Sequence, residues 1–212
     1  MIFTTSALTD VPIHVGGRLT VEGPARLRYS LSGGYLPPAY VGLINDVCVA
    51  ADWYSEETAS LVQATIENSL VIRNHVGWRP WEAHGFQFEL GYGWVGLGGG
   101  LTGTEVIAAA TGVDVSGELA DDLAFTARAS LHQLDVSAGW EWTIRKHFLL
   151  RADLGGAFTL ASTTVIEPDF DVPRLAEPFV DELTAAGEDY LDETFTTYVH
   201  TPTVSAAAGW RF

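Results

Sequence analysis

The chain has 212 residues, which is enough for one or two folded domains with a buried core. Its 27 acidic residues against 11 basic ones leave a formal net charge of −16, and its only lysine is Lys146. Nucleic-acid binding is excluded, because a phosphate backbone is bound by clustered Lys and Arg. A hydrophobic content of 47% excludes a disordered acidic protein, and a single cysteine, Cys48, excludes an internal disulfide framework and a CxxC-type zinc site.

No stretch approaches the ~18 consecutive apolar residues of a membrane-spanning helix. The first residues also lack the basic start and apolar run of a signal peptide. Taken alone, these observations would suggest a cytoplasmic protein. Because the strand pattern described next indicates otherwise, we expect that a signal peptide has been removed or is missing from this chain.

Segments in which large apolar residues alternate with small or charged ones recur along the chain. In the clearest, from Phe86 to Trp94, even positions hold Phe, Leu, Tyr and Trp, whereas odd positions hold Gln, Glu and Gly. A strict period of two predicts β-strands. In chain order, the predicted strands cover about residues 11–22, 27–35, 70–79, 86–94, 133–142, 148–154 and 203–212. Closure of a barrel requires an even number, so a shortened strand over about Ile2 to Leu8 is predicted before them.

One face of these strands is large and aromatic, whereas the other carries Gly, Ser, Thr and charges of both signs. Rows of Phe, Trp and Leu would not fit inside a small barrel, but a bilayer accepts them as an outer belt around a narrow polar lumen. The sequence therefore predicts an all-β fold over residues 1–212: a single domain that forms an eight-stranded antiparallel transmembrane β-barrel.

The links between the strands alternate in length. Three are short, at about 23–25, 80–85 and 145–147, and three are long, at about 37–68, 97–130 and 163–197. Short turns on one side and long loops on the other are typical of outer-membrane barrels. We assign the short turns and both termini to the periplasm and the long loops to the extracellular side.

The last segment, from Thr203 to Phe212, ends the chain on an aromatic residue in an alternating strand. It resembles the C-terminal signal of bacterial outer-membrane β-barrels. The eight-strand layout is similar to the small barrels typified by the transmembrane domain of outer-membrane protein A. The resemblance covers the strands and implies a porin-like integral protein of a Gram-negative bacterium, located in the outer membrane. It also implies insertion by the barrel-assembly machinery and contact with the lipid bilayer and lipopolysaccharide.

The strand face that would line the lumen carries charges of both signs. The predicted lumen charge network consists of Arg18, Glu22, Arg26, Arg28, Arg73, His75, Glu89, Asp135, Glu141, Arg151 and Asp153. Side chains about fill the interior of an eight-stranded barrel, and an unpaired charge there would be costly. We expect mutually satisfied ion pairs that plug the lumen; a gated polar path is the alternative.

Aromatic residues cluster next to the short turns, at the C-terminus and near the outer ends of the strands. The predicted membrane-interface aromatics are Trp78, Trp81, Phe86, Trp94, Trp140, Trp142, Phe148, Trp210 and Phe212. All except Trp94 should form the periplasmic girdle, because Trp and Tyr are enriched at membrane–water interfaces.

The long loops are partly helical by their apolar spacing. Helices are predicted over about 40–48, from a cap at Ser55 to Ile66, over 105–110, and from Pro178 to Tyr190. Their apolar faces could pack together and cap the barrel, leave a groove for an apolar ligand, or lie in the outer leaflet. Most of the acidic residues also lie in these loops, against two basic residues, Arg128 and Arg174. They form either a solvated face or a surface that attracts cations or a basic partner.

Glu167, Asp169 and Asp171 place carboxylates at alternate positions and could bind Ca²⁺ with loop carbonyls, although the Gly and terminal Glu of an EF-hand are missing. Otherwise no cofactor is predicted. A lipid-modifying enzyme would need a His with Ser, Thr or Asp at the outer rim, where His200 is the only hint, and no catalytic residues are predicted.

The predicted function is non-enzymatic: a structural or surface-interaction protein that acts through its acidic helical loops, with an extracellular ligand that the sequence does not identify. The alternatives are a narrow channel or transporter for small solutes and, third, a lipid-modifying outer-membrane enzyme.

Overall fold

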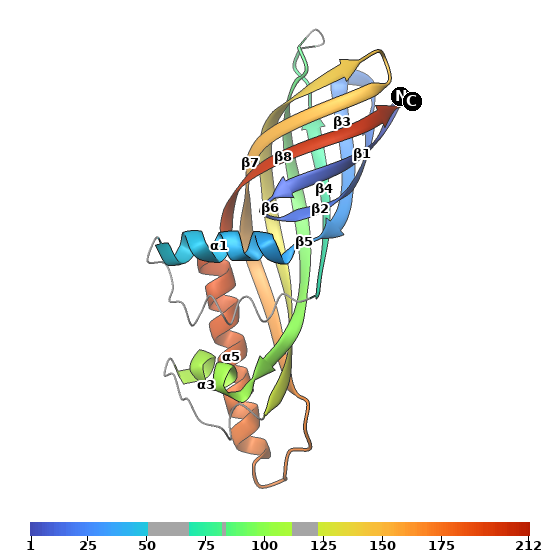
Figure 1. The fold of residues 1–212 in the computed structure, drawn as a ribbon. Helices are drawn as coiled ribbons and strands as arrows, with labels where there is room; N and C mark the ends of the chain where they lie inside the picture. The colour runs from blue at the N-terminus through green and yellow to red at the C-terminus, as the bar shows by residue number, and fades with distance from the viewer. Residues whose placement is uncertain (51–67, 82–83, 112–122) are drawn as a thin grey trace.

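A computed structural model describes residues 1–50, 68–81, 84–111 and 123–212. Eight antiparallel strands form a closed barrel in sequence order, and β8 pairs with β1. The strands are β1 Ile2–Val11, β2 His14–Glu22, β3 Leu27–Tyr35, β4 Asn68–Trp78, β5 Phe86–Thr102, β6 Ala124–Ile144, β7 Phe148–Pro168 and β8 His200–Arg211. Both termini lie together at one end of the barrel (Figure 1). The predicted eight-stranded barrel is confirmed.

In the described part of the chain, three α-helices lie at the other end of the barrel: α1 Pro38–Ala50, α3 Gly103–Thr111 and α5 Glu177–Tyr198 (Figure 1). They confirm the helices predicted over 40–48, 105–110 and 178–190, whereas the predicted helix from Ser55 to Ile66 lies outside the described residues. A short 3-10 helix, η1 Pro24–Arg26, connects β2 and β3. Within the described part of the chain, no helix combines the length and hydropathy needed to cross a bilayer.

Three strands are much longer than a membrane requires. A tilted strand crosses a bilayer with ~9–11 residues, but β5 has 17 residues and β6 and β7 have 21 each. Their outer ends continue as a three-stranded sheet beyond the other strands, toward α3 and α5 (Figure 1). The predicted loops 97–130 and 163–197 were therefore too long, because residues 97–102, 124–130 and 163–168 are strand.

Helix α5 lies along the outer part of β7, where the pairing with β8 has ended at Phe158 and His200 and no other described strand takes its place. The hydroxyls of Ser162 and Thr164 donate to Asp192 Oδ1 at 2.8 and 2.7 Å. The backbone N–H of Ile166 donates to Glu188 Oε1 at 2.8 Å. The helix thus supplies acceptors to a strand edge that would otherwise be open to pairing with another chain.

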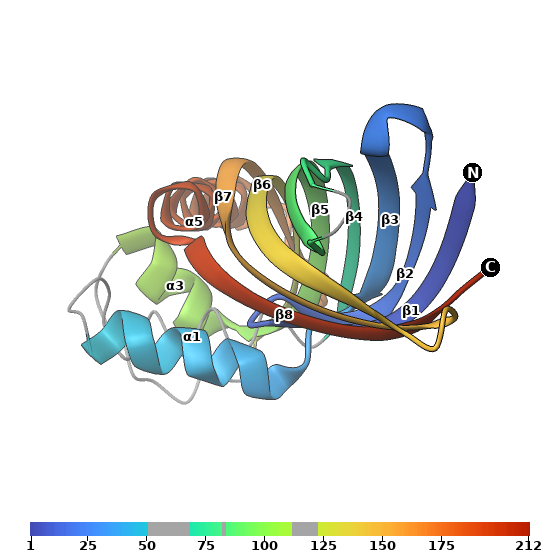
Figure 2. The ribbon, with the colours of Figure 1, turned by 90° about the horizontal axis from the view of Figure 1, so that it is seen from above.

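Helix α3 continues directly from β5 through a capping box. The N–H of Thr102 donates to Glu105 Oε2 at 2.7 Å, and the N–H of Glu105 donates back to Thr102 Oγ1 at 3.3 Å. Val106 is fully buried against the sheet and α5. Gly187 lets α5 pack closely against β7, because a β-carbon at this position would lie only 3.1 Å from Ile166 Cδ1. The helices gather on one side of the barrel, with α5 next to β7 (Figure 2).

Candidate functional site

The lumen next to the short turns holds a carboxylate that two arginines share. Glu141 lies 2.5 Å from Arg28 Nη2 and 2.5 Å from Arg79 Nη2. Glu22 is farther away, at 3.8 Å from Arg28 Nε and 3.5 Å from Arg79 Nη2. Arg28 and Arg79 each lie near both carboxylates, and the planar guanidinium suits such shared pairing because its fork of N–H donors can satisfy more than one carboxylate.

A second group of charges surrounds Glu89, farther along the lumen. Arg18 and Arg151 both donate to its carboxylate, with 2.9 Å between Arg151 Nη1 and Glu89 Oε1. Arg151 Nε also donates to Asp153 Oδ2 at 2.6 Å. Gln87 joins this group to the first. Its amide nitrogen donates to Asp153 Oδ1 at 3.1 Å, and its amide oxygen accepts a hydrogen bond from Arg28. The two groups therefore form one continuous network.

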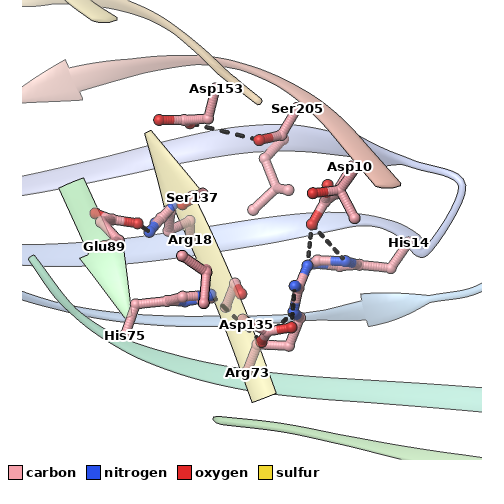
Figure 3. A pocket seen from close by; sticks show the side chains of 14 residues that line it. Asp10, His14, Arg18, Arg73, His75, Glu89, Asp135, Ser137, Asp153 and Ser205 are labelled. Carbon is pink, nitrogen blue, oxygen red and sulfur yellow. Dashed lines mark hydrogen bonds and ion pairs between the residues drawn. The ribbon is translucent and has the colours of Figure 1, made fainter. Parts of the chain in front are cut away.

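The third group lies toward the outer end and is centred on Arg73 (Figure 3). Arg73 Nε lies 2.8 Å from Asp135 Oδ2 and its Nη2 lies 2.5 Å from Oδ1, a bidentate pair, while Nη1 donates to Asp10. His75 Nε2 lies 3.5 Å from Asp135, and His14 Nδ1 lies 3.8 Å from Asp10. Within the described residues, neither ring nitrogen of the buried His14 has a hydrogen-bond partner.

Glycines on the inward face leave the space that these long side chains occupy. A β-carbon at Gly91 would lie 2.3 Å from His75 Cδ2, and one at Gly139 would lie 2.0 Å from Asp153 Oδ1. The remaining cavity among the second and third groups measures about 20 Å³. That volume accommodates about one water molecule.

Beyond the third group, the inner surface becomes apolar. Along β5, Glu89 is followed by Val95, Leu97 and Leu101 on the same inward face. Together with residues of the other strands and the helices, these side chains form one buried cluster, which we name the stopper. Its members include Ile13, Leu36, Val41, Val71, Val95, Leu97, Leu101, Val106, Phe125, Leu131, Ala157, Ile166, Leu191 and Phe195.

The outer surface of the membrane-spanning part of the barrel is apolar. Around the charged lumen it carries exposed apolar side chains, among them Leu19, Leu31, Ile72, Val76, Leu90, Val136, Leu154 and Val204. Beyond Trp94, the outward positions of β5 are Gly96, Gly98 and Gly100. An apolar exterior around a charged interior is the arrangement of a membrane-spanning barrel of the outer-membrane type. The protein is therefore an integral outer-membrane β-barrel embedded in the lipid bilayer.

The predicted interface aromatics lie on this exterior. Seven are exposed: Trp78, Trp81, Trp140, Trp142, Phe148, Trp210 and Phe212. Phe86 and Trp94 are partly buried. The ring of Phe86 lies 5.8 Å from Trp81 and 5.5 Å from Trp140, so neighbouring aromatics contact one another at the short-turn end.

Ten of the eleven predicted lumen residues lie inside the barrel, and Arg26 does not. Arg26 is exposed in η1, with a φ of 62°, and donates to Pro80 O at 2.8 Å outside the lumen. Placing it inside was wrong, because the period of two ends at this turn. Asp10 was missed, because the first strand was predicted to end at Leu8. Asp10 lies two residues farther along, on the same face as Leu8, so extending the alternation by one step would have placed it in the lumen.

The carboxylates predicted to bind calcium do not converge. Glu167 lies 3.6 Å from Arg128, and Asp169 accepts from Thr126 Oγ1 at 2.7 Å. Asp171 is exposed. In the part of the chain that the structure describes, no three His, Cys, Asp or Glu side chains form a metal-binding group. The loop acids Asp52, Glu56, Glu57, Glu67, Asp114, Glu118, Asp121 and Asp122 lie outside the described residues.

His200 is exposed at the start of β8, and its ring lies 6.0 Å from that of Phe158. Among the contacts of the described residues, it makes no hydrogen bond to Ser, Thr or Asp. Thr196, four residues before it in the sequence, donates to Asp192 O at 2.7 Å within α5.

No family of known sequences matches this chain, and no curated protein matches it. Solved structures similar to it include the N-terminal β-barrel domain of Pseudomonas aeruginosa OprF, at 8% identity, 100% and 96% coverage of the two chains and a TM-score of 0.47. Acinetobacter baumannii CarO is similar at 11% identity, 100% and 98% coverage and a TM-score of 0.43. A major outer membrane protein from Thermus thermophilus is similar at 13% identity, full coverage of both chains and a TM-score of 0.48. The two faces of the barrel, rather than these resemblances, identify the chain as an outer-membrane protein.

Proposed function

We propose that the protein is a closed, non-enzymatic barrel that anchors an acidic, helix-capped surface outside the outer membrane. The observation that carries this proposal is the filling of the lumen by two barriers in series, the ion-pair network and the stopper. Among the described residues, the cavity between the charged groups measures about 20 Å³, room for about one water molecule, which supports a closed lumen.

Each barrier opposes ion passage for a different reason. Opening the network would separate buried ion pairs, and leaving one charge of such a pair alone costs ~3–5 kcal/mol. The stopper, by contrast, offers an ion no polar partner in place of its water. Removal of one barrier therefore leaves the other in place.

The test is single-channel conductance of the refolded protein in a planar bilayer. We expect silence from the wild type, from Arg73→Ser with Asp135→Ser, and from Val95→Ser with Leu131→Ser. Of these proteins, only the variant that combines all four substitutions should show conductance steps, because it weakens both barriers at the same time.

The matched control is Arg128→Ser with Glu167→Ser, which removes an exposed ion pair outside the lumen. It should be silent like the wild type. Heat-modifiable migration of each variant establishes that it is folded. Reproducible conductance steps from folded wild-type protein would reject the closed barrel.

One observation favours a narrow channel as the second candidate function: charged side chains line the lumen through its membrane-spanning part. In that case, the three arginine-centred groups would rearrange into a gated polar path. The same wild-type recording decides between the two functions.

The outer surface carries the interaction role in this proposal. Glu188 and Asp192 of α5 are occupied by β7, but other acids of the helix are exposed: Glu177, Asp181, Glu182, Asp189 and Glu193. Their summed field favours a cationic partner. We further propose that the C-terminal strand directs insertion by the barrel-assembly machinery and that the extracellular end of the barrel wall contacts lipopolysaccharide.

A further inference from the structure

The segment that joins β7 to α5 lies at the far end of the molecule from the two termini (Figure 1). It exposes two large apolar side chains: Leu175 is 99% exposed and Phe179 is 67% exposed. Among the described residues, Leu175 is the most exposed large apolar side chain. Lipid covers the exposed apolar side chains of the barrel wall, so the position of this segment relative to the membrane decides what can cover it.

The bilayer does not reach this segment. β7 has 21 residues, and a tilted strand crosses a bilayer with ~9–11 residues. The remaining part of β7, at ~3.3 Å per residue, carries its end roughly 30 Å along the strand direction beyond the membrane. Leu175 and Phe179 therefore face water, where a macromolecule in solution can reach them.

The segment forms an ordered turn. Before it, the ring of Phe170 packs edge-on against Phe125 of the stopper, with 5.4 Å between the ring centroids. Within it, the N–H groups of Ala176 and Glu177 both donate to Pro173 O, at 2.7 and 3.2 Å. These bonds have helical spacing and lead directly into α5. The two apolar side chains are thus presented by a preformed turn, which lowers the entropy that a partner must remove on binding.

The charge around this turn is strongly negative. Residues 169–182 contain five acidic side chains and one basic side chain: Asp169, Asp171, Glu177, Asp181 and Glu182 against Arg174. Asp169 accepts from Thr126 Oγ1, and the other four acids are exposed. A second copy of the chain would bring like charges together, which disfavours self-association through the turn. Charge complementarity therefore selects a cationic partner.

We propose that the turn binds a cationic, partly apolar segment of an extracellular protein, with Leu175 and Phe179 as its apolar anchors. The two side chains lie four positions apart in a run of helical hydrogen bonds, so they project on the same side. Apolar side chains of the partner pack on them and exclude water, while its Lys and Arg side chains pair with the surrounding acids. This inference rests on the surface-interaction role proposed above and gives that role a site.

The probe is a phage-displayed library of short random peptides, selected on the full chain in phosphatidylcholine nanodiscs. Phages that bind empty nanodiscs are removed first, because cationic amphipathic peptides also bind bilayers. We expect the enriched peptides to combine Lys or Arg with Trp, Phe or Leu. The association and dissociation rate constants of one synthetic peptide from this selection are then measured on each variant.

The first variant removes the apolar anchors. Leu175→Ser with Phe179→Ser should weaken binding about tenfold or more, mainly through faster dissociation, because it truncates the centre of the interface. Leu175→Met with Phe179→Leu keeps both side chains apolar and should restore most of the affinity. The matched control is Val165→Ser, which removes an exposed apolar side chain of β7 outside the turn and should leave both rate constants unchanged.

The second variant removes the surrounding charges. Glu177→Gln with Asp181→Asn and Glu182→Gln should mainly slow association and reduce its dependence on salt, because charges at the rim act on the encounter. The matched control is Asp189→Asn, an exposed acid farther along α5, which should change association much less. Heat-modifiable migration establishes that each variant is folded, and all these positions are exposed.

Three results would overturn the proposal. Undiminished binding to the Leu175→Ser, Phe179→Ser variant would place the peptide elsewhere on the protein. A selection that enriches no peptides, or only peptides without Lys and Arg, would reject the cationic partner. A wild-type dimer that the same variant abolishes would show that a second copy occupies the turn.

Failure of this proposal and failure of the proposed function give different results. Peptide binding that depends on Asp189 but not on Leu175 and Phe179 would reject the turn and leave the acidic surface role in place. Conductance steps from folded wild-type protein would reject the closed barrel, whatever the peptide measurements show.

Discussion

The membrane-embedded barrel and the extracellular cap, formed by the outer ends of β5–β7 with α3 and α5, are built from the same strands with opposite faces. Inside the barrel, β6 presents Asp135 and Glu141, and outside it presents Val136 and Trp140. A few residues farther along the same strand, the buried face presents Phe125 and the outer face Arg128.

The difference shows that the surroundings decide what an alternating strand buries. In the bilayer, hydrocarbon takes the apolar face, so the polar face turns inward and must pair its charges. In water, the apolar face turns inward and packs against helices. The stopper lies at the boundary between the two regions, where the inward face changes from charged to apolar.

The largest expected loss of stability follows from removing a charge at the centre of the lumen. Arg73→Met should lower the free energy of unfolding by ~3–5 kcal/mol, because it leaves Asp10 and Asp135 buried without their partner. Urea unfolding in phospholipid vesicles measures this loss. Adding Asp10→Asn and Asp135→Asn should restore part of it, and a triple variant no more stable than the single one would contradict the charge explanation.

In the cap, a comparable loss of stability is expected from opening a cavity in the apolar cluster. Phe125→Ala removes a fully buried ring of the stopper and should cost ~3–5 kcal/mol, by lost burial and an unfilled space. The loss should be confined to the cap, so proteolysis of α5 should accelerate while the barrel stays heat-modifiable. Equal loss of both would show that the two regions unfold together.

A matched pair of substitutions on β7 tests the outer faces. Leu154→Lys places a charge on the lipid face and should destabilise the barrel by ~2–4 kcal/mol. Val165→Lys, on the outward face of the extension, should change the free energy of unfolding by less than ~0.5 kcal/mol, as ordinary surface substitutions do. Similar losses at both sites would place residue 165 in the membrane.

The smallest expected effect concerns the seam between α5 and β7. Asp192→Ala removes the acceptor of Ser162 and Thr164 and should cost ~1–3 kcal/mol, the desolvation penalty of unpaired polar groups. Hydrogen exchange of α5 should become faster while that of the barrel strands is unchanged. Glu193→Ala, an exposed acid on the same helix, is the control and should leave the exchange of α5 unaltered.

Sequence reasoning recovered the barrel because period two is a local property. The register of Phe86 to Trp94 needed no knowledge of its neighbours, since a strand exposes alternate residues whatever it pairs with. The same reasoning stopped short on β7. There Gln133 pairs with Thr159 but His132 with Ala161, so Leu160 is an extra residue that shifts the alternation by one. The predicted strand ended at residue 154, and the part of β7 beyond this bulge, residues 163–168, was assigned to a loop.

The sequence by itself determined the eight strands, the direction of their two faces and most of the residues that line the lumen. It did so because lipid contact restricts every outward position in the same way. Only the tertiary structure decided which charges pair, that Asp10 joins Arg73, and that the inner face changes from polar to apolar at the stopper. These features depend on the shear of the barrel and on contacts between residues more than sixty positions apart, such as Arg73 with Asp10 and Asp135, which no local pattern contains.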